Sequence, residues 1–214
     1  MKFDSISKYC INLEKRPERK ISVSKEFDRI GIKVEFRKAV DGTKISIPLN
    51  CMKYTEYNVS GIIGCLLSHI ELIRYAKESD QQYICVFEDD IELCLDFKKR
   101  ISLIEEFALD FDMFYLGGHF HGNDIKATDY EYIFKAKGIA GTYAYIMRNT
   151  IFDYILDHFS YNWGIDQFYA EVIQKKFKCY AFIPFLVDHK DGISDVAFTR
   201  VNYPLTHKNY RSEL

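Results

Sequence analysis

Short apolar segments alternate along the chain with longer segments of helical spacing, and this alternation constrains the fold more than any other feature of the sequence. The expected strands are residues 9–13, 34–40, 83–87, 111–116, 142–147 and 179–183. The expected helices are residues 16–30, 61–78, 150–158 and 166–176. Strands that alternate with helices indicate an α/β fold with a mainly parallel sheet flanked by helices.

The chain length suits a single domain, residues 1–214. Apolar residues make up 48% of the sequence and charged residues 28%, so we expect a sizeable core and no long disordered region. Residues 186–214 are polar and poorly periodic. We expect this stretch to be either a flexible tail or a segment that covers a site.

Charge and composition exclude several classes of protein. The net charge is −2 without a basic patch, so no nucleic-acid partner is expected. No apolar run approaches the ~20 residues that span a bilayer, and polar residues interrupt the N-terminal segment, so neither a transmembrane segment nor a signal peptide is expected. The six cysteines are scattered without a CxxC pair, which is typical of reduced thiols in a cytoplasmic protein. P-loop, Rossmann and nucleophile-elbow motifs are absent.

An acidic triplet, Glu88-Asp89-Asp90, directly follows the apolar run at residues 83–87. Ligands in open α/β sheets bind outside the carboxyl ends of the strands. Three adjacent carboxylates repel one another, and a divalent cation such as Mg²⁺ or Mn²⁺ relieves this repulsion. The triplet therefore predicts either a cation site that holds a diphosphate or a solvated helix start, where acids are also favoured. The wholly apolar strand before it favours the cation site.

Five segments match a known pattern in chain order: residues 11–19 (INLEKRPER), 61–69 (GIIGCLLSH), 86–90 (VFEDD), 111–117 (FDMFYLG) and 141–145 (GTYAY). Together they resemble glycosyltransferase family 25, which includes bacterial lipooligosaccharide galactosyltransferases and collagen galactosyltransferases. Asp166 falls where the family has an aspartate after an isoleucine. Residues after Pro184 match only loosely.

The resemblance implies a GT-A-like fold, a nucleotide-sugar donor that is usually UDP-linked, and Mn²⁺ (or Mg²⁺) as the cofactor. We therefore expect transfer of a hexose, galactose first and glucose or N-acetylglucosamine next, to a sugar or a hydroxylated protein, with inversion at the sugar. The cation would stabilise the leaving diphosphate. Two alternatives stay open: a non-catalytic nucleotide-sugar-binding module and a metal-dependent phosphohydrolase that uses the triplet.

The expected metal ligands are Asp90 first and Asp89 next, whereas Glu88 is expected to face the nucleotide sugar, as Asp89 also does. His189 is a candidate late ligand, because a C-terminal histidine closes the metal site in this fold type; otherwise it is an exposed loop histidine. An inverting transfer needs a general base, and Asp166 is the candidate. The other interpretation of Asp166 is an acid at a helix N-terminus.

Three further residues are expected to bind the nucleotide sugar: Asn12, Arg16 and Ser68. Arg16 follows the first strand and could pair with phosphate, although a solvated helix start explains it too. Ser68 lies beside His69 on a helix face, where a core histidine held by a hydrogen bond is an equal alternative. On the acceptor side, Trp163 is expected to stack on a sugar and His119 to line the cleft; His119 with His121 is otherwise surface, or a weak zinc pair.

Overall fold

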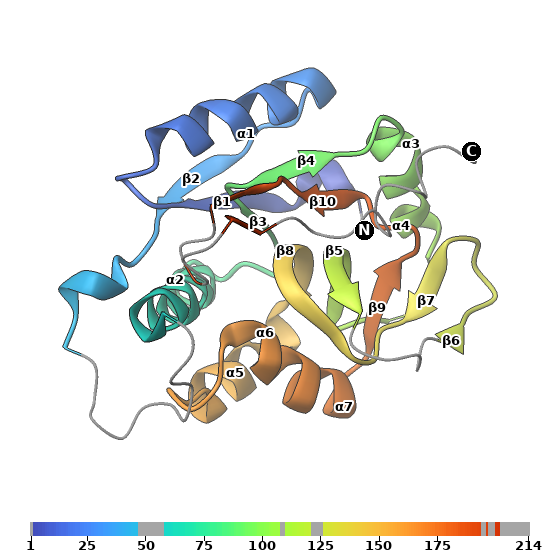
Figure 1. The fold of residues 1–214 in the computed structure, drawn as a ribbon. Helices are drawn as coiled ribbons and strands as arrows, with labels where there is room; N and C mark the ends of the chain where they lie inside the picture. Colours follow the sequence, from blue (N-terminus) through green and yellow to red (C-terminus); the bar gives the residue numbers. More distant parts are fainter. Residues whose placement is uncertain are drawn as a thin grey trace.

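The computed structural model describes residues 2–46, 58–107, 110–120, 126–193, 196 and 200–201. Its centre is an eight-stranded sheet of order β2-β1-β3-β8-β5-β9-β7-β6 (Figure 1). The strands are β1 (Ser7–Asn12), β2 (Glu35–Lys38), β3 (Tyr83–Glu88), β5 (Met113–Phe120), β6 (Lys126–Ala127), β7 (Ile133–Lys135), β8 (Ile139–Arg148) and β9 (Cys179–Phe182).

The sheet is mixed. Strand β1 pairs in parallel with β2 and β3, and β5 pairs in parallel with β9. The other four pairings are antiparallel, with β8 inserted between β3 and β5. The predicted α/β fold class is confirmed. The parallel part of the sheet, β2-β1-β3, brings the carboxyl ends of three strands to one edge, where ligands bind in such sheets.

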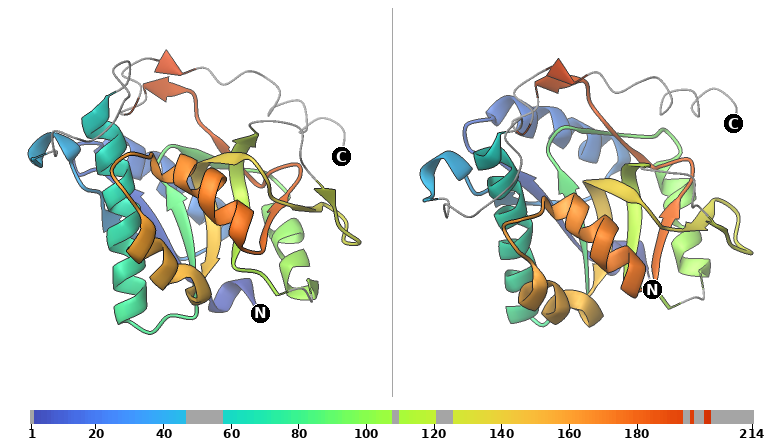
Figure 2. Two further views of the ribbon diagram at one scale, coloured as in Figure 1. Left: turned by 90° about the horizontal axis from the view of Figure 1, so that it is seen from below. Right: turned by 60° about the horizontal axis from the view of Figure 1, so that its bottom comes forward.

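Helices cover both faces of the sheet (Figures 1 and 2). One face carries α1 (Pro17–Ile30), α3 (Phe97–Ile101) and α4 (Leu103–Glu106). The opposite face carries α2 (Val59–Glu78), α5 (Phe152–His158), α6 (Ile165–Phe168), a π-helical turn (Tyr169–Ile173) and α7 (Gln174–Lys176), so the expected helix 166–176 is three consecutive helical segments. Short 3-10 turns occur at Phe3–Ser5, Gly42–Lys44 (η2) and Asn149–Ile151.

Strand β3 shows why its sequence is apolar without alternation. Cys85 and Phe87 lie in the core beneath α1 and α3, whereas Ile84 and Val86 lie in the core beneath α2 and α5. All four side chains are fully buried. A strand that is covered on both faces reads as a continuous apolar run, and the acidic triplet begins where this cover ends.

Two pairs of short strands that the sequence pattern did not predict complete the site end of the molecule. Strand β10 (Val187–His189) pairs antiparallel with β4 (Ile91–Leu93), and β11 (Gly192–Ile193) pairs with β12 (Arg200–Val201). Gly117 lets β10 lie directly against β5, because a Cβ atom at Gly117 would stand 2.4 Å from the Val187 carbonyl oxygen. Residues 186–193 of the expected tail therefore run across the site end of the sheet; most of the later ones lie outside the described residues.

Within the described part of the chain, α2 is the one helix that is long and apolar enough to cross a membrane, judged by length and composition alone. Half of its apolar 18-residue stretch is buried in the protein, and the core helix of a globular fold has the same length and composition. Its buried face is made of core residues, among them Leu66, Ile70 and Ile73.

Candidate active site

A cavity of about 680 Å³ opens at the carboxyl ends of β1 and β3. Its walls come from η2, α2, β8, the start of α6 and the end of β10. All three members of the acidic triplet line it, together with Ser68, His119, Asp166 and His189. Residues that lie far apart in the sequence and were singled out for different roles therefore share one cavity.

The three carboxylates of the triplet have different partners. Glu88 Oε1 accepts a hydrogen bond from Thr142 Oγ1 and lies 3.7 Å from His69 Nε2. Asp89 Oδ2 accepts a hydrogen bond of 2.6 Å from Asn12 Nδ2. Asp90 Oδ2 lies 3.1 Å from His189 Nε2. Glu88 thus faces α2 and β8, whereas Asp90 faces β10.

Arg19 bridges the two aspartates. Its Nη1 atom lies 3.1 Å from Asp89 Oδ1 and 2.6 Å from Asp90 Oδ2, and all three side chains are at most 14% exposed. Sequence reasoning missed this residue and favoured Arg16. The signal was present, because Arg19 is the last arginine of the INLEKRPER segment and lies one helical turn beyond Arg16.

Burial and charge act on the two aspartates in opposite directions. Burial, followed by the negative charge of Asp90, raises the pKa of Asp89 to about 6. Burial also opposes ionisation of Asp90, but the hydrogen bond and charge of His189, together with Arg19, hold the pKa of Asp90 below its ordinary value. Burial lowers the pKa of His189, yet its bond to Asp90 and that carboxylate's charge raise it overall. The contact between Asp90 and His189 therefore favours the ionised carboxylate and the protonated imidazole relative to the isolated groups.

Asp90 has a feature that a divalent cation would satisfy. Among the described residues, Asp90 Oδ1 is a buried carboxylate oxygen without a hydrogen-bond partner. A buried polar atom is normally paired, and a carboxylate oxygen is the ligand type that Mn²⁺ and Mg²⁺ take. Asp90 and His189 therefore fit the divalent cation that the sequence led us to expect.

Asp166 lies near the start of α6, after the N-cap residue Gly164, and lines the cavity. Its Oδ1 atom accepts a hydrogen bond of 2.8 Å from the Gln167 amide. The carboxylate is half-buried, so one side of it remains open to a bound molecule. His119 also lines the cavity, and its Nδ1 atom lies 3.0 Å from the Tyr143 hydroxyl.

Of the other predicted residues, Ser68 lines the cavity and Asn12 is not among its described lining residues. Ser68 donates to the Gly64 carbonyl at 2.6 Å and accepts from the Val40 amide at 2.8 Å, so it ties the loop after β2 to α2. Asn12 lies beneath Asp89 and is only 8% exposed. Neither Arg16 nor Trp163 is among the described residues that line the cavity. Arg16 instead pairs with the exposed Glu18, at 2.6 Å. His121 lies outside the described residues.

Helix α2 presents Cys65, Ser68 and His69 to the cavity because residues three and four apart share one helix face. His69 is 1% exposed, and its Nδ1 atom lies 2.8 Å from the Tyr145 hydroxyl. The two interpretations of this histidine therefore hold together: it is a buried histidine fixed by a hydrogen bond, and its other nitrogen reaches the cavity floor at Glu88.

Comparison with known families places these motifs in one group. Residues 5–169 match the model of a family described as Glycosyltransferase family 25 (LPS biosynthesis protein). The chain belongs to glycosyltransferase family 25. The matched segment contains the acidic triplet, Arg19 and Asp166, whereas His189 lies beyond it.

Two relatives of this family 25 chain show the extent of the similarity. A Glycosyltransferase 25 family member from Aedes aegypti is 34% identical over 124 residues, which is 51% of this chain and 20% of the relative. Procollagen galactosyltransferase 2 from Homo sapiens is 28% identical over 133 residues, 55% of this chain and 21% of the relative. The chain thus spans about a fifth of the length of these curated relatives.

A solved structure, a glycosyltransferase involved in the glycosylation of the major capsid of PBCV-1, superposes with a TM-score of 0.47. It is 11% identical to this family 25 chain, and the superposition covers 88% of this chain and 96% of that chain. A similarity of this size carries no conclusion about function.

Proposed function

We propose that this family 25 chain transfers a hexose from a UDP-sugar to a hydroxyl group of a sugar or a hydroxylated protein, with inversion at the sugar and with Mn²⁺ or Mg²⁺ as cofactor. Galactose is the first choice of sugar, because relatives such as human procollagen galactosyltransferase 2 carry that activity in their names. Glucose and N-acetylglucosamine come next.

One observation carries the proposal. In a cavity large enough for a ligand, a buried aspartate directed at a histidine keeps one carboxylate oxygen that has no hydrogen-bond partner among the described residues. Asp90 and His189 would hold the cation, with Asp89 beside them. When bound, the cation supplies positive charge that stabilises the leaving diphosphate.

The side chains of the protein prepare this site before any ligand binds. Asn12 and Arg19 fix the orientation of Asp89, and Arg19 also offsets the charge of Asp90. Thr142 holds the Glu88 carboxylate, which lines the cavity and is free to accept hydrogen bonds from sugar or ribose hydroxyls through its second oxygen. Preorganised groups of this kind cost little reorganisation during reaction.

Asp166 is proposed to act as the general base. Its Oδ1 atom is held by the Gln167 amide, which leaves Oδ2 to take the proton from the acceptor hydroxyl as that oxygen attacks the sugar carbon. The carboxylate lines the same cavity as Glu88 and Asp90, so donor and acceptor would meet between them. Inversion follows from a single attack opposite the leaving diphosphate.

The first test measures UDP release from UDP-galactose, UDP-glucose and UDP-N-acetylglucosamine, with Mn²⁺, with Mg²⁺ and with a chelator. We expect slow release from one of the three sugars with the cation and none with the chelator. The absence of both binding and hydrolysis across this panel would overturn the proposal. Turnover of simple phosphoesters without a sugar would instead indicate a phosphohydrolase.

Two variants separate the proposed roles. Asp90→Asn should abolish cation-assisted UDP binding and turnover together. Asp166→Asn should keep UDP binding and lower kcat by about 10²–10⁴-fold, the usual contribution of a general base. Glu106→Gln, an exposed acid on α4, is the matched control and should change neither quantity. Binding without turnover in the unmodified protein would identify a nucleotide-sugar-binding module instead.

A further inference from the structure

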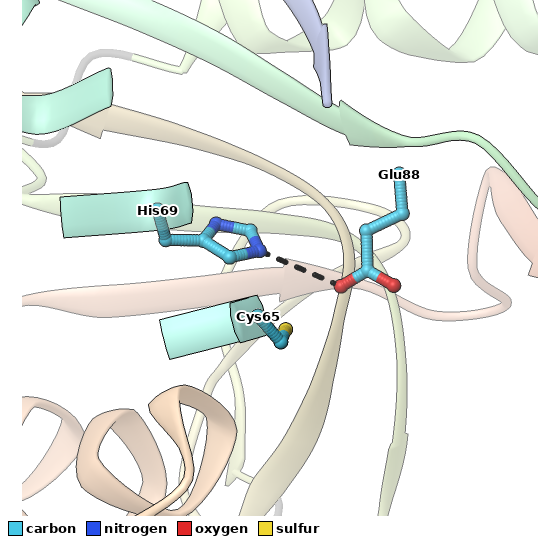
Figure 3. A group of neighbouring side chains, drawn as sticks. All are labelled: Cys65, His69 and Glu88. Carbon is cyan, nitrogen blue, oxygen red and sulfur yellow. Dashed lines mark ion pairs between the residues drawn. The ribbon is translucent and has the colours of Figure 1, made fainter. Parts of the chain in front are cut away.

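A second group of potential metal ligands lines the same cavity. Cys65 and His69 lie four positions apart on α2, so both side chains project from one face of the helix toward Glu88 at the end of β3 (Figure 3). One sulfur, one nitrogen and one carboxylate oxygen from these residues lie within 4.8 Å of one another.

The surrounding residues fix the orientation of this cluster. The Tyr145 hydroxyl holds His69 Nδ1 at 2.8 Å, which directs Nε2 toward Glu88 Oε1 at 3.7 Å. Thr142 donates to the same Glu88 oxygen. Metal-binding histidines typically bond through their second nitrogen to a fixed partner, because that bond sets the tautomer and the ring orientation.

We propose that Cys65, His69 and Glu88 form a zinc site. A ligand set of thiolate, imidazole and carboxylate selects Zn²⁺, whereas the oxygen ligand of Asp90 suits the harder Mn²⁺ or Mg²⁺. Ligand atoms of a tetrahedral zinc ion lie roughly 3.5 Å apart, given Zn–S of about 2.3 Å and Zn–N of about 2.0 Å. The cluster therefore needs a contraction of only about 1 Å, within the reach of side-chain rotation. The fourth position opens on the cavity.

Zinc binding at this site exchanges one proton for the metal ion. Zinc displaces the proton of the Cys65 thiol, the Zn–S bond replaces the S–H bond, and the proton leaves to solvent. Neutral His69 ligates through Nε2, and the ionised Glu88 carboxylate neutralises one of the ion's charges. No oxidant or reductant takes part.

Cobalt reports thiolate ligation directly, because Co²⁺ takes the ligands of zinc and shows a charge-transfer absorption band in the near ultraviolet when it binds a thiolate. The metal-free protein, titrated with Co²⁺, should develop this band, and added Zn²⁺ should remove it. Cys65→Ser should lack the band, whereas Cys94→Ser, at a half-buried cysteine outside the cluster, should keep it. A wild-type protein without the band, or a band that persists in Cys65→Ser, would overturn the proposal.

Two further measurements hold even if Cys65→Ser folds poorly. In the unmodified protein, zinc should slow alkylation of Cys65 by iodoacetamide, followed on its peptide by mass spectrometry, and leave that of Cys94 unchanged. Tyr145→Phe keeps all three ligands but removes the hydroxyl that holds His69, so it should weaken zinc binding about 10–100-fold. Equal alkylation rates with and without zinc would contradict the site.

If the proposed function holds, zinc binding at this site should affect sugar transfer, and this expectation alone rests on the proposed function. A zinc ion on Glu88 occupies a carboxylate assigned to the nucleotide sugar, so micromolar zinc should inhibit transfer in the presence of Mn²⁺. Cys65→Ser should lose this inhibition relative to its own zinc-free rate. Should no transfer be found at all, the cobalt band still decides the metal site; should the band appear without inhibition, the site stands and only its effect on transfer is refuted.

Discussion

At the level of single residues, Arg19 offsets the negative charge of the two aspartates in the site. It is the shared partner of Asp89 and Asp90, in a place where each side chain is at most 14% exposed. From a buried strand followed by three acids, the sequence predicted a cation site at the triplet, and the divided roles of the three acids stay a prediction. It did not predict Arg19, because the helix after the first strand places several cationic side chains near the end of that strand. Only the three-dimensional packing shows which of them contacts the aspartates.

Replacing Arg19 should therefore destabilise the metal-free protein more than the protein loaded with Mn²⁺. Arg19→Gln leaves the nearly buried Asp89 without its cationic partner and Asp90 with His189 alone, and breaking such a pair costs about 3 kcal/mol of unfolding free energy. A bound cation would offset part of this loss. Urea denaturation with Mn²⁺ and with a chelator measures both values, with Arg74→Gln on the exposed face of α2 as control. Equal losses in the two conditions would contradict this account of Arg19.

At the level of elements, the strands and helices with a strong local pattern were predicted, and those held by distant contacts were not. Residues 83–87 were expected as a strand and form most of β3, and residues 16–30 contain α1. Strands β4 and β10 have three residues each and exist through their pairing with one another across the site. Helix α2 begins at Val59, two residues before the start of the expected helix at residues 61–78.

Helix α2 contacts the loop after β2 closely enough to reverse a helix-propensity effect. A Cβ atom on Gly64 would stand 2.7 Å from the Val40 carbonyl oxygen and 2.9 Å from the Gly42 amide nitrogen. Alanine usually stabilises a helix by about 1 kcal/mol relative to glycine. Here Gly64→Ala should lower the unfolding free energy by about 1–3 kcal/mol, because the backbones must separate.

The measurement is chemical denaturation, with Glu78→Ala at the exposed end of α2 as control and an expected change within about 0.5 kcal/mol. A stabilised Gly64→Ala variant would show that the loop and the helix are not in contact at this distance.

At the scale of the whole molecule, the fold brings the proposed metal ligands together from distant parts of the chain. Asp89 and Asp90 follow β3, whereas His189 comes from β10, about a hundred residues later and beyond the segment that matches family 25. The α/β class was predictable from the alternation of strands and helices. The antiparallel placement of β8 was not, because a buried strand has the same apolar run in either direction.

Because the proposed cation site joins distant parts of the chain, cation binding should stabilise the fold as a whole. Mn²⁺ at a hundred times its Kd should add about 2.7 kcal/mol to the unfolding free energy. This gain should disappear in Asp90→Asn and remain in Glu106→Gln. Thermal unfolding with and without Mn²⁺ measures it, and an unchanged gain in Asp90→Asn would place the cation elsewhere.

The most direct test of the central claim is a crystal of the protein soaked with UDP and Mn²⁺, with the metal located by its anomalous scattering. We predict one manganese peak within bonding distance of Asp90 Oδ1 and His189 Nε2, with the diphosphate of UDP bound to it in the cavity. UDP bound without manganese, or manganese bound away from Asp90, would contradict the proposed metal-dependent transfer.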